Sequence, residues 1–388
     1  MPFNFDHIID RRCTDCTKWT RYGPEVLPAW IADMDFAAPE PILQALHERI
    51  DHGVFGYENP SLSLKETVVD WLARRHAWEV TTDDIVFLPG LVSGLNLVCR
   101  AYGYTGDRAA MLTPVYSPFL SAPVQQGLAA DMAPLRSSLR EGRLHYEIDF
   151  DALAAAITPR TRLFLLCHPH NPIGREFTLA EMERLAALCL ERDVLICSDE
   201  IHCDLMLDGR RHRPFASLGP EIADHTVTLM APSKTFNIPG LGCSFAVVTN
   251  PRLRTRLEQA AAGIVPHVNV LGLVAAQAAF SRCDEWLAAL QAYLTANRDA
   301  LLAFVDEHLP GVIATAPSAT YLAWLDFRHA GLPTDPHTFF LERARVALND
   351  GPTFGPGGEG CVRFNFGCPR ATMMQALGQM REALTGLA

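Results

Sequence analysis

Short apolar runs recur through the middle of the chain and alternate with segments of helical spacing. Each run is too short for a buried helix and is followed by loop-forming residues, so the runs predict buried strands. Strands that alternate with helices form a largely parallel sheet with helices on both faces. The sequence therefore predicts an α/β protein with strands at 85–88, 109–113, 163–167, 194–198, 226–230 and 245–249.

The pattern changes after Pro251, where long helices appear, one of them at about 284–308. A strand at 321–327, a helix at about 338–344, a strand at 361–366 and a helix at 371–387 then predict a smaller α+β unit. Residues 1–45 are irregular and carry aromatic anchors, so this arm must pack on another part of the protein to be ordered. We predict that residues 1–45 form an arm belonging to the small domain, 46–285 the large domain and 286–388 the small domain.

Three polar residues follow three of the predicted strands: Asn171, Asp199 and Lys234. In an open α/β sheet such strand ends meet at the crevice that binds ligands. A lysine there can form a Schiff base with the aldehyde of pyridoxal phosphate, and a carboxylate can keep the pyridine nitrogen protonated so that the ring accepts electrons. Taken singly, each residue would be read as a surface group. Their convergence favours an enzyme that uses this cofactor.

The motifs around these residues resemble a known family. Asn171-Pro-Ile-Gly174, Ser198-Asp-Glu-Ile-His202 and Ala231-Pro-Ser-Lys-Thr-Phe-Asn237 resemble the fold-type I pyridoxal phosphate enzymes of the aspartate aminotransferase superfamily. Within it they resemble the MalY/PatB branch of cystathionine β-lyase-like carbon–sulfur lyases. Other landmarks extend the resemblance over residues 30–370. It implies a large domain with a mostly parallel seven-stranded sheet and a smaller α+β domain.

The resemblance implies a role for each residue at the cofactor ring. Lys234 is expected to form the Schiff base and then to remove the substrate α-proton, and Asp199 to pair with the ring nitrogen. Asn171 is expected to hydrogen-bond the phenolic oxygen and to reach the substrate carboxylate. Tyr116 is expected to stack on the ring. His202 stands where many aminotransferases have a tyrosine near the same oxygen, although it could also be a capped loop histidine.

The cofactor phosphate needs a helix N-terminus and small residues. Val92 and Ser93 follow a strand and a glycine turn, and they are expected to offer amides and a hydroxyl, as is Ser233. By resemblance, Tyr57 reaches the phosphate of a neighbouring subunit, which predicts a homodimer. Many aminotransferases place a phosphate-binding arginine at the position of Gly242, so its absence here favours the lyase branch.

Arg363 is expected to bind the substrate α-carboxylate, because a guanidinium can pair with a carboxylate through two hydrogen bonds. Its apolar neighbours favour this role over that of a surface ion pair. Ala32 and Asp33 lie in the arm segment that borders this site in relatives. His168 and Ile173 differ from the commoner asparagine and threonine of the family, with no mechanism attached to either.

The resemblance predicts β-elimination from a sulfur amino acid such as cystathionine, releasing a thiol, pyruvate and ammonia. An aminotransferase would share the steps up to removal of the α-proton and remains the alternative. A regulatory protein that binds pyridoxal phosphate and acts through a protein partner is less favoured, since the whole set of catalytic residues is intact.

Charge and composition limit the classes of partner that the protein can bind. The net charge of −11 and the lack of a basic run disfavour nucleic acid. No apolar stretch reaches the roughly 18 residues that span a bilayer, and no signal peptide is visible. We therefore expect a cytoplasmic protein whose 11 cysteines are reduced. Cys13 and Cys16 lack a second pair at suitable spacing, so no metal site is predicted.

Overall fold

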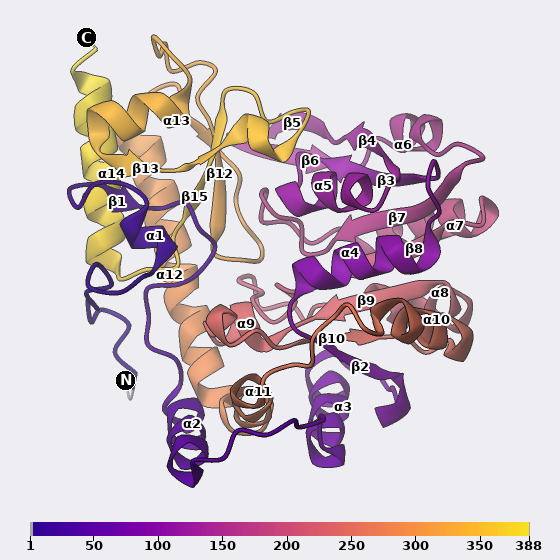
Figure 1. Cartoon of the computed structure of the whole chain (residues 1–388). Helices are drawn as coiled ribbons and strands as arrows, with labels where there is room; N and C mark the ends of the chain where they lie inside the picture. The colour runs from indigo at the N-terminus through magenta and orange to yellow at the C-terminus, as the bar shows by residue number, and fades with distance from the viewer. Residues whose placement is uncertain (1–2, 388) are drawn as a thin grey trace.

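The computed structural model describes residues 3–387 and places a large sheet with flanking helices beside a smaller sheet (Figure 1). All six predicted runs form strands of the large sheet. A seventh strand, at one edge, was not among the predicted runs. The strands lie in the order β2 (Ile85–Leu88), β10 (Ser244–Val247), β9 (Thr226–Met230), β8 (Leu195–Asp199), β7 (Thr161–Cys167), β3 (Arg108–Thr113) and β4 (Ala129–Pro134).

The large sheet is parallel except for β10, which pairs antiparallel with both β2 and β9. Across the sheet, the neighbouring strands β4, β3, β7, β8 and β9 each pair parallel with the next. The prediction of a mostly parallel seven-stranded sheet is thus confirmed. Because β7, β8 and β9 are parallel neighbours, the loops that follow them leave the sheet at the same edge.

Alternation along the strands explains why helices cover both faces of this sheet. In β7, Leu163 and Leu165 pack with one group of helices, whereas Phe164 and Leu166 pack with another. The first group comprises α4 (Leu91–Tyr102), α5 (Ser117–Gln125) and α10 (Pro251–Ala261), and the second comprises α6 (Phe150–Ala156), α7 (Leu179–Glu191) and α8 (Pro220–Asp224).

Long helices connect the large sheet to the small one. Helices α2 (Glu40–His52), α3 (Leu62–His76) and α11 (Val270–Arg282) pack together beside β2 and β10. Helix α12 (Asp284–His308) has the predicted bounds and runs from this group to the small sheet (Figure 1).

The small sheet is antiparallel, with the order β11 (Ile313–Ala314), β12 (Leu322–Asp326), β15 (Cys361–Asn365) and β14 (Asn349–Asp350). Helix α14 (Arg370–Thr385) packs against α12. The helix expected at 338–344 is divided: α13 (Pro336–Phe339) is followed by a π-helical turn at Phe340–Ala344. The hairpin of β5 (Arg136–Arg140) and β6 (Arg143–Glu147) was not predicted.

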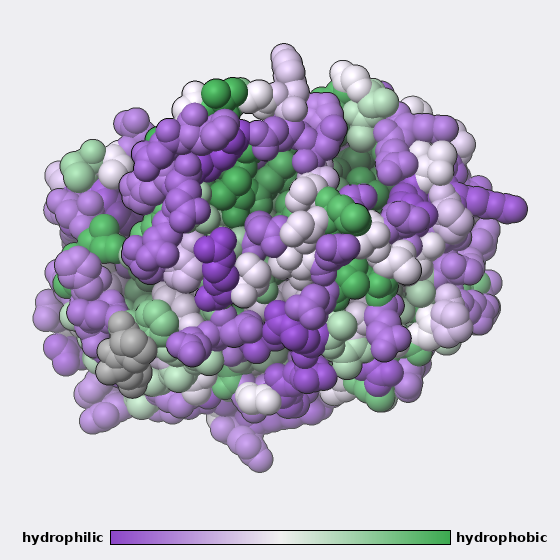
Figure 2. Space-filling model, turned by 90° about the horizontal axis from the view of Figure 1, so that it is seen from below, coloured by the Kyte–Doolittle hydropathy of each residue, from purple (hydrophilic) through white to green (hydrophobic). Residues whose placement is uncertain are grey.

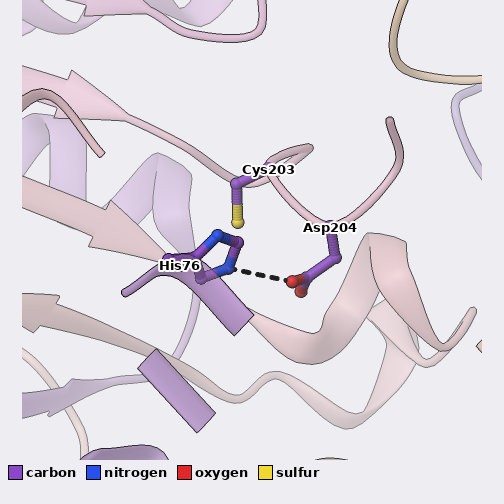
Figure 3. Close-up of side chains that lie close together, drawn as sticks. All are labelled: His76, Cys203 and Asp204. Carbon is purple, nitrogen blue, oxygen red and sulfur yellow. Dashed lines mark hydrogen bonds and ion pairs between the residues drawn. The ribbon is translucent and has the colours of Figure 1, made fainter. Parts of the chain in front are cut away.

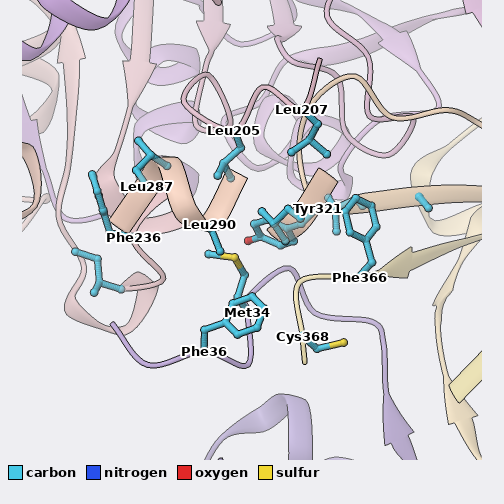
Figure 4. Close-up of a cluster of buried hydrophobic side chains, with 14 of the residues drawn as sticks. Met34, Phe36, Leu205, Leu207, Phe236, Leu287, Leu290, Tyr321, Phe366 and Cys368 are labelled. Carbon is cyan, nitrogen blue, oxygen red and sulfur yellow. The ribbon is translucent and has the colours of Figure 1, made fainter. Parts of the chain in front are cut away.

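The N-terminal arm packs on elements of the smaller α+β unit. After the short helix α1 (Thr17–Thr20), β1 (Leu27–Pro28) pairs with β13 (Val346–Ala347). Further along, Met34 and Phe36 lie beside Leu290 of α12 and residues of the small unit (Figure 4). One hydrophobic cluster thus includes the arm, the large sheet and the small sheet. The domain boundaries at residues 45 and 285 remain predictions.

The surface is mostly hydrophilic. On the face seen from below, hydrophobic residues gather in a recess (Figure 2). None of the described helices is both long enough and apolar enough to cross a bilayer.

Candidate active site

The loops that follow β7, β8 and β9 meet in a cavity of about 440 Å³. Asn171 lies in the first loop, Asp199 ends β8, and Lys234 lies in α9 (Pro232–Thr235) directly after β9. We call this cavity the crevice. The structure brings together most of the predicted residues there: Ala32, Val92, Ser93, Tyr116, Asn171, Asp199, His202, Ser233, Lys234 and Arg363.

Lys234 is held between the large sheet and the arm. Its Nζ donates a hydrogen bond to the backbone oxygen of Ala32, which also accepts one from the Tyr321 hydroxyl at 2.9 Å. Burial lowers the pKa of Lys234 to about 8, and the Arg363 charge acts in the same direction, while Asp33 and Asp199 oppose the change. An amine with this pKa is partly unprotonated near neutral pH, so it can act as a base.

Asp199 is a buried carboxylate with few partners. Its side chain is 5 % exposed, and Oδ1 accepts a hydrogen bond from the Ile201 amide at 3.1 Å. Burial raises the pKa of Asp199 to about 7. Among residues 3–387 it has no ion pair with a lysine, arginine or histidine. A protonated ring nitrogen of a ligand in the crevice would supply the missing positive charge.

Arg363 is the matching buried cation. Its guanidinium donates to Asn171 Oδ1 at 3.0 Å, to the Trp30 backbone oxygen at 2.6 Å and to Asn349 Oδ1. Burial lowers the pKa of Arg363 to about 10. No carboxylate pairs with it in the described part of the chain, and its Nε has no hydrogen-bond partner there. A ligand carboxylate would complete this site.

Tyr116 and His202, the two other residues predicted to contact the cofactor ring, also line the crevice. Burial raises the pKa of Tyr116, so its hydroxyl stays protonated at neutral pH. Burial, together with the charges of Lys234 and Arg363, holds the pKa of His202 well below its usual value. His202 is therefore a neutral imidazole, and its buried Nδ1 lacks a partner within residues 3–387. The structure does not favour the reading of His202 as a capped loop residue.

The predicted phosphate end lies at the start of α4. Gly90 precedes this helix without a side-chain cap, so the amides at its first turn, near Val92 and Ser93, are available to an anion. Gly242 has a φ of +57°, and a Cβ atom there would lie 3.2 Å from the Pro89 backbone oxygen. An arginine at this position would thus be strained. The absence of a phosphate-binding arginine at position 242 is therefore consistent with the backbone conformation there.

Two predicted site residues lie outside the crevice. Asp33 does not line it and instead forms ion pairs with Arg11 at 2.7 Å and Lys18 at 3.3 Å, so its place beside the substrate stays a prediction. Tyr57 is fully exposed, in the segment between α2 and α3. Ala32 does border the site, through its backbone oxygen.

Asn349 and Trp30 were missed as ligands of Arg363. Asn349 stands in Val346-Ala-Leu-Asn-Asp-Gly351, which is one of the other landmarks of the family resemblance and was the available signal. Trp30 and Ala32 act through backbone oxygens, and a backbone oxygen has no signature in the residue type. Only the packing of the arm reveals these two contacts.

Comparisons with known proteins agree with this geometry. Residues 31–380 match the family described as aminotransferase class I and II. The chain is 40 % identical to "Cystathionine beta-lyase PatB" of Bacillus subtilis, over 98 % of this chain and 100 % of that protein. The chain belongs to the aminotransferase class I and II family.

Solved structures of family members support the same conclusion. The structure of OvoB superimposes with a TM-score of 0.93 at 42 % identity, covering 99 % of both chains. A pyridoxal phosphate-bound carbon–sulfur lyase from Staphylococcus hominis gives a TM-score of 0.92 at 34 % identity, again over 99 % of both chains. The fold-type I architecture predicted from the sequence is therefore confirmed.

Proposed function

We propose that the protein is a pyridoxal phosphate-dependent carbon–sulfur β-lyase. It would cleave cystathionine or a related cysteine S-conjugate to a thiol, pyruvate and ammonia. One observation carries this proposal: a lysine of lowered pKa lies in the same crevice as a buried carboxylate and a buried guanidinium that lack partners of opposite charge. The names of PatB and of the S. hominis lyase support the reaction class.

The described residues fit the cofactor. Lys234 would join its aldehyde, Asp199 would pair with the ring nitrogen, and Tyr116 would lie against the ring. Asn171 and His202 would face the phenolic oxygen, and the first turn of α4 with Ser233 would bind the phosphate. When bound, pyridoxal phosphate supplies an electron sink for the electron pair released at the substrate Cα.

The reaction then follows from the protein groups. Arg363, oriented by Asn171 and Asn349, binds the substrate carboxylate and fixes the direction of the Cα–H bond. Lys234 Nζ accepts the α-proton, and its lowered pKa suits this transfer near neutral pH. The electron pair expels the thiolate from Cβ, and hydrolysis of the remaining enamine gives pyruvate and ammonia. Transamination would instead need a proton to be returned to the cofactor, in competition with loss of the thiolate.

The test is product analysis with cystathionine and no keto acid. We expect homocysteine, pyruvate and ammonia in equal amounts, and transamination of alanine or aspartate slower by several orders of magnitude. Transamination as fast as thiol release would support the aminotransferase alternative. A protein that shows the bound cofactor spectrum but turns over no sulfur amino acid would support the regulatory alternative. Parallel kinetics on cystathionine, cystine, cysteine and larger S-conjugates would identify the preferred leaving group.

We also propose a homodimer in which Tyr57 reaches the phosphate of the partner. Tyr57, Phe55 and Val54 are exposed on the single chain, as is Val92 at the start of α4. Pairing two chains would cover these side chains. Tyr57→Phe should weaken cofactor binding about 10- to 100-fold, the effect of one hydrogen bond to a charged group, without abolishing turnover. Sedimentation that shows an active monomer would contradict the proposal.

A cytoplasmic location is part of the same proposal. Nine of the eleven cysteines are buried free thiols, which suits a reducing compartment.

A further inference from the structure

A second group of titratable residues lies outside the crevice. We call it the histidine cluster, and it consists of His168, Glu176, Glu200 and His212. None of these side chains is more than 7 % exposed. Asp199 lines the crevice, and the next residue, Glu200, belongs to the cluster. The proposed β-lyase reaction uses no member of the cluster.

His168 is the unexplained member. Its side chain is 0 % exposed, and neither ring nitrogen has a hydrogen-bond partner among residues 3–387. Its ring stacks on Phe177 at 5.9 Å and lies 4.9 Å from the ring of His212. A buried polar group without a partner is destabilising, so a fully buried imidazole of this kind suggests a ligand. The sequence also departs from the family's commoner asparagine at this position.

His212 is held in one orientation. Its Nε2 lies 2.8 Å from Glu200 Oε2, and Glu200 is itself fixed by the Ser198 hydroxyl at 2.7 Å and the Phe215 amide at 2.9 Å. The other ring nitrogen, Nδ1, lies 2.8 Å from Glu176 Oε1. A histidine that binds a metal through one ring nitrogen usually donates the N–H of the other nitrogen to a carboxylate that fixes the ring.

We propose that His168, Glu176 and His212 bind a divalent transition metal such as Zn²⁺, with Glu200 orienting His212. Ligand atoms of the three residues lie within 4.8 Å of one another. Two imidazoles and one carboxylate form a donor set that suits this ion. The cation replaces the proton between His212 Nδ1 and Glu176, and one proton leaves to solvent. The charges of Glu176 and Glu200 then equal that of the ion.

One member of the cluster borders a second cavity. His212 lines this cavity of about 360 Å³, as do Arg210 and His76, whereas His168 and Glu176 do not. Arg210 Nη1 lies 3.5 Å from the other oxygen of Glu176, while Oε1 also accepts from the Arg213 amide at 3.4 Å and keeps a second lone pair for the metal. A bound ion would join the segment after β7, which carries Asn171, to the segment after β8, the strand that Asp199 ends. It would thus support the crevice whichever reaction occurs there.

A neighbouring group provides a control. His76, Cys203 and Asp204 also lie close together, and His76 Nε2 is 3.0 Å from Asp204 Oδ1 (Figure 3). The Cys203 sulfur lies beside the other ring nitrogen (Figure 3). The second oxygen of Asp204 already accepts from the Thr235 hydroxyl at 2.9 Å. Both oxygens of Asp204 therefore already have partners within the protein.

The experiment uses the untagged holoenzyme after treatment with a chelator. On titration with Co²⁺ we expect one ion per chain and the visible absorption of low-coordinate Co²⁺, measured against the same holoenzyme without cobalt. Zn²⁺ should compete with Co²⁺ and raise the melting temperature. His168→Asn, which restores the family's commoner residue, should remove both effects. Glu200→Gln should weaken binding about 10- to 100-fold, and Cys203→Ser should bind like the wild type.

Three results would overturn the proposal. They are a wild-type protein without cobalt absorption or melting shift, equal binding by the His168→Asn variant, and loss of binding in the Cys203→Ser variant, which would place the ion at the neighbouring group. All readouts are independent of turnover, so failure of the metal site and failure of the β-lyase proposal are distinguishable.

Discussion

Asp199 and Glu200 are adjacent, buried carboxylates whose pKa values shift in opposite directions. Burial acts to raise the pKa of both. For Asp199 it prevails and the pKa rises to about 7. For Glu200 the hydrogen bond and charge of His212 outweigh burial, and the pKa falls below its usual value. Glu200 accepts from Ser198, Phe215 and His212, whereas Asp199 accepts from one backbone amide.

The difference shows that burial alone does not determine the pKa of a carboxyl group. Glu200 itself is satisfied within the protein and can stabilise the fold. The crevice keeps Asp199 and Arg363 without partners of opposite charge among the described residues, which is costly unless a charged ligand completes them. Charge that the fold leaves uncompensated therefore indicates where a ligand binds.

The largest expected effect is at Lys234, on the crevice side of the comparison. Lys234→Ala removes both the proposed cofactor amine and the base, so turnover should fall at least about 10⁴-fold. The visible absorption band of the bound cofactor should also disappear. Lys65→Ala, in α3, is the matched control and should behave like the wild type. An unchanged absorption band in Lys234→Ala would contradict the assignment.

Paired variants test the comparison directly. Asp199→Asn should lower kcat on the order of 10²- to 10³-fold with little change in the free energy of unfolding. Glu200→Gln should lower that free energy by about 3 to 5 kcal/mol, because it breaks a buried ion pair with His212. Urea unfolding and pyruvate release measure the two effects. Equal losses of stability in both variants would mean that burial alone sets the role of each carboxylate.

Arg363→Ala should reduce kcat/KM for cystathionine by about 30-fold or more, which corresponds to about 2 kcal/mol of transition-state stabilisation. The lost interaction is the two-hydrogen-bond pair with the substrate carboxylate. Arg363→Lys keeps the charge without the planar pair of donors, so it should recover only part of the activity. An unchanged kcat/KM in the alanine variant would exclude Arg363 from substrate binding.

The smallest expected effect is at the arm, under acid conditions. Burial alone would raise the pKa of Asp33, but Lys18 and Arg11 outweigh it and lower that pKa. The carboxylate thus stabilises the fold above the unfolded pKa of about 3.9, and this contribution is lost as the pH falls through the lower folded value. We expect the arm to loosen below about pH 4, detected by the fluorescence of Trp19, which donates to Asp35 at 2.9 Å. Asp33→Asn should remove this component of the acid transition, and a transition unchanged in that variant would exclude Asp33 as its cause.

The crevice was largely predictable because its residues lie in local motifs at strand ends. Lys234, Asp199 and Asn171 each follow an apolar run, and parallel strands bring such ends to one edge. Strand β4 was missed because it is an edge strand with little burial, so its apolar pattern is weak. No local pattern predicts the ion pairs of Asp33 with Arg11 and Lys18, because they depend on how the arm folds back.

The sequence by itself determined the alternation of strands and helices and the chemistry at the strand ends, because both follow from residue type and short spacing. Only the tertiary structure decided which backbone oxygens hold Lys234 and Arg363, and that His168, Glu176 and His212 converge. These contacts join segments far apart in the chain, and backbone oxygens are the same in every residue. Their formation depends on packing between segments, which local patterns do not encode.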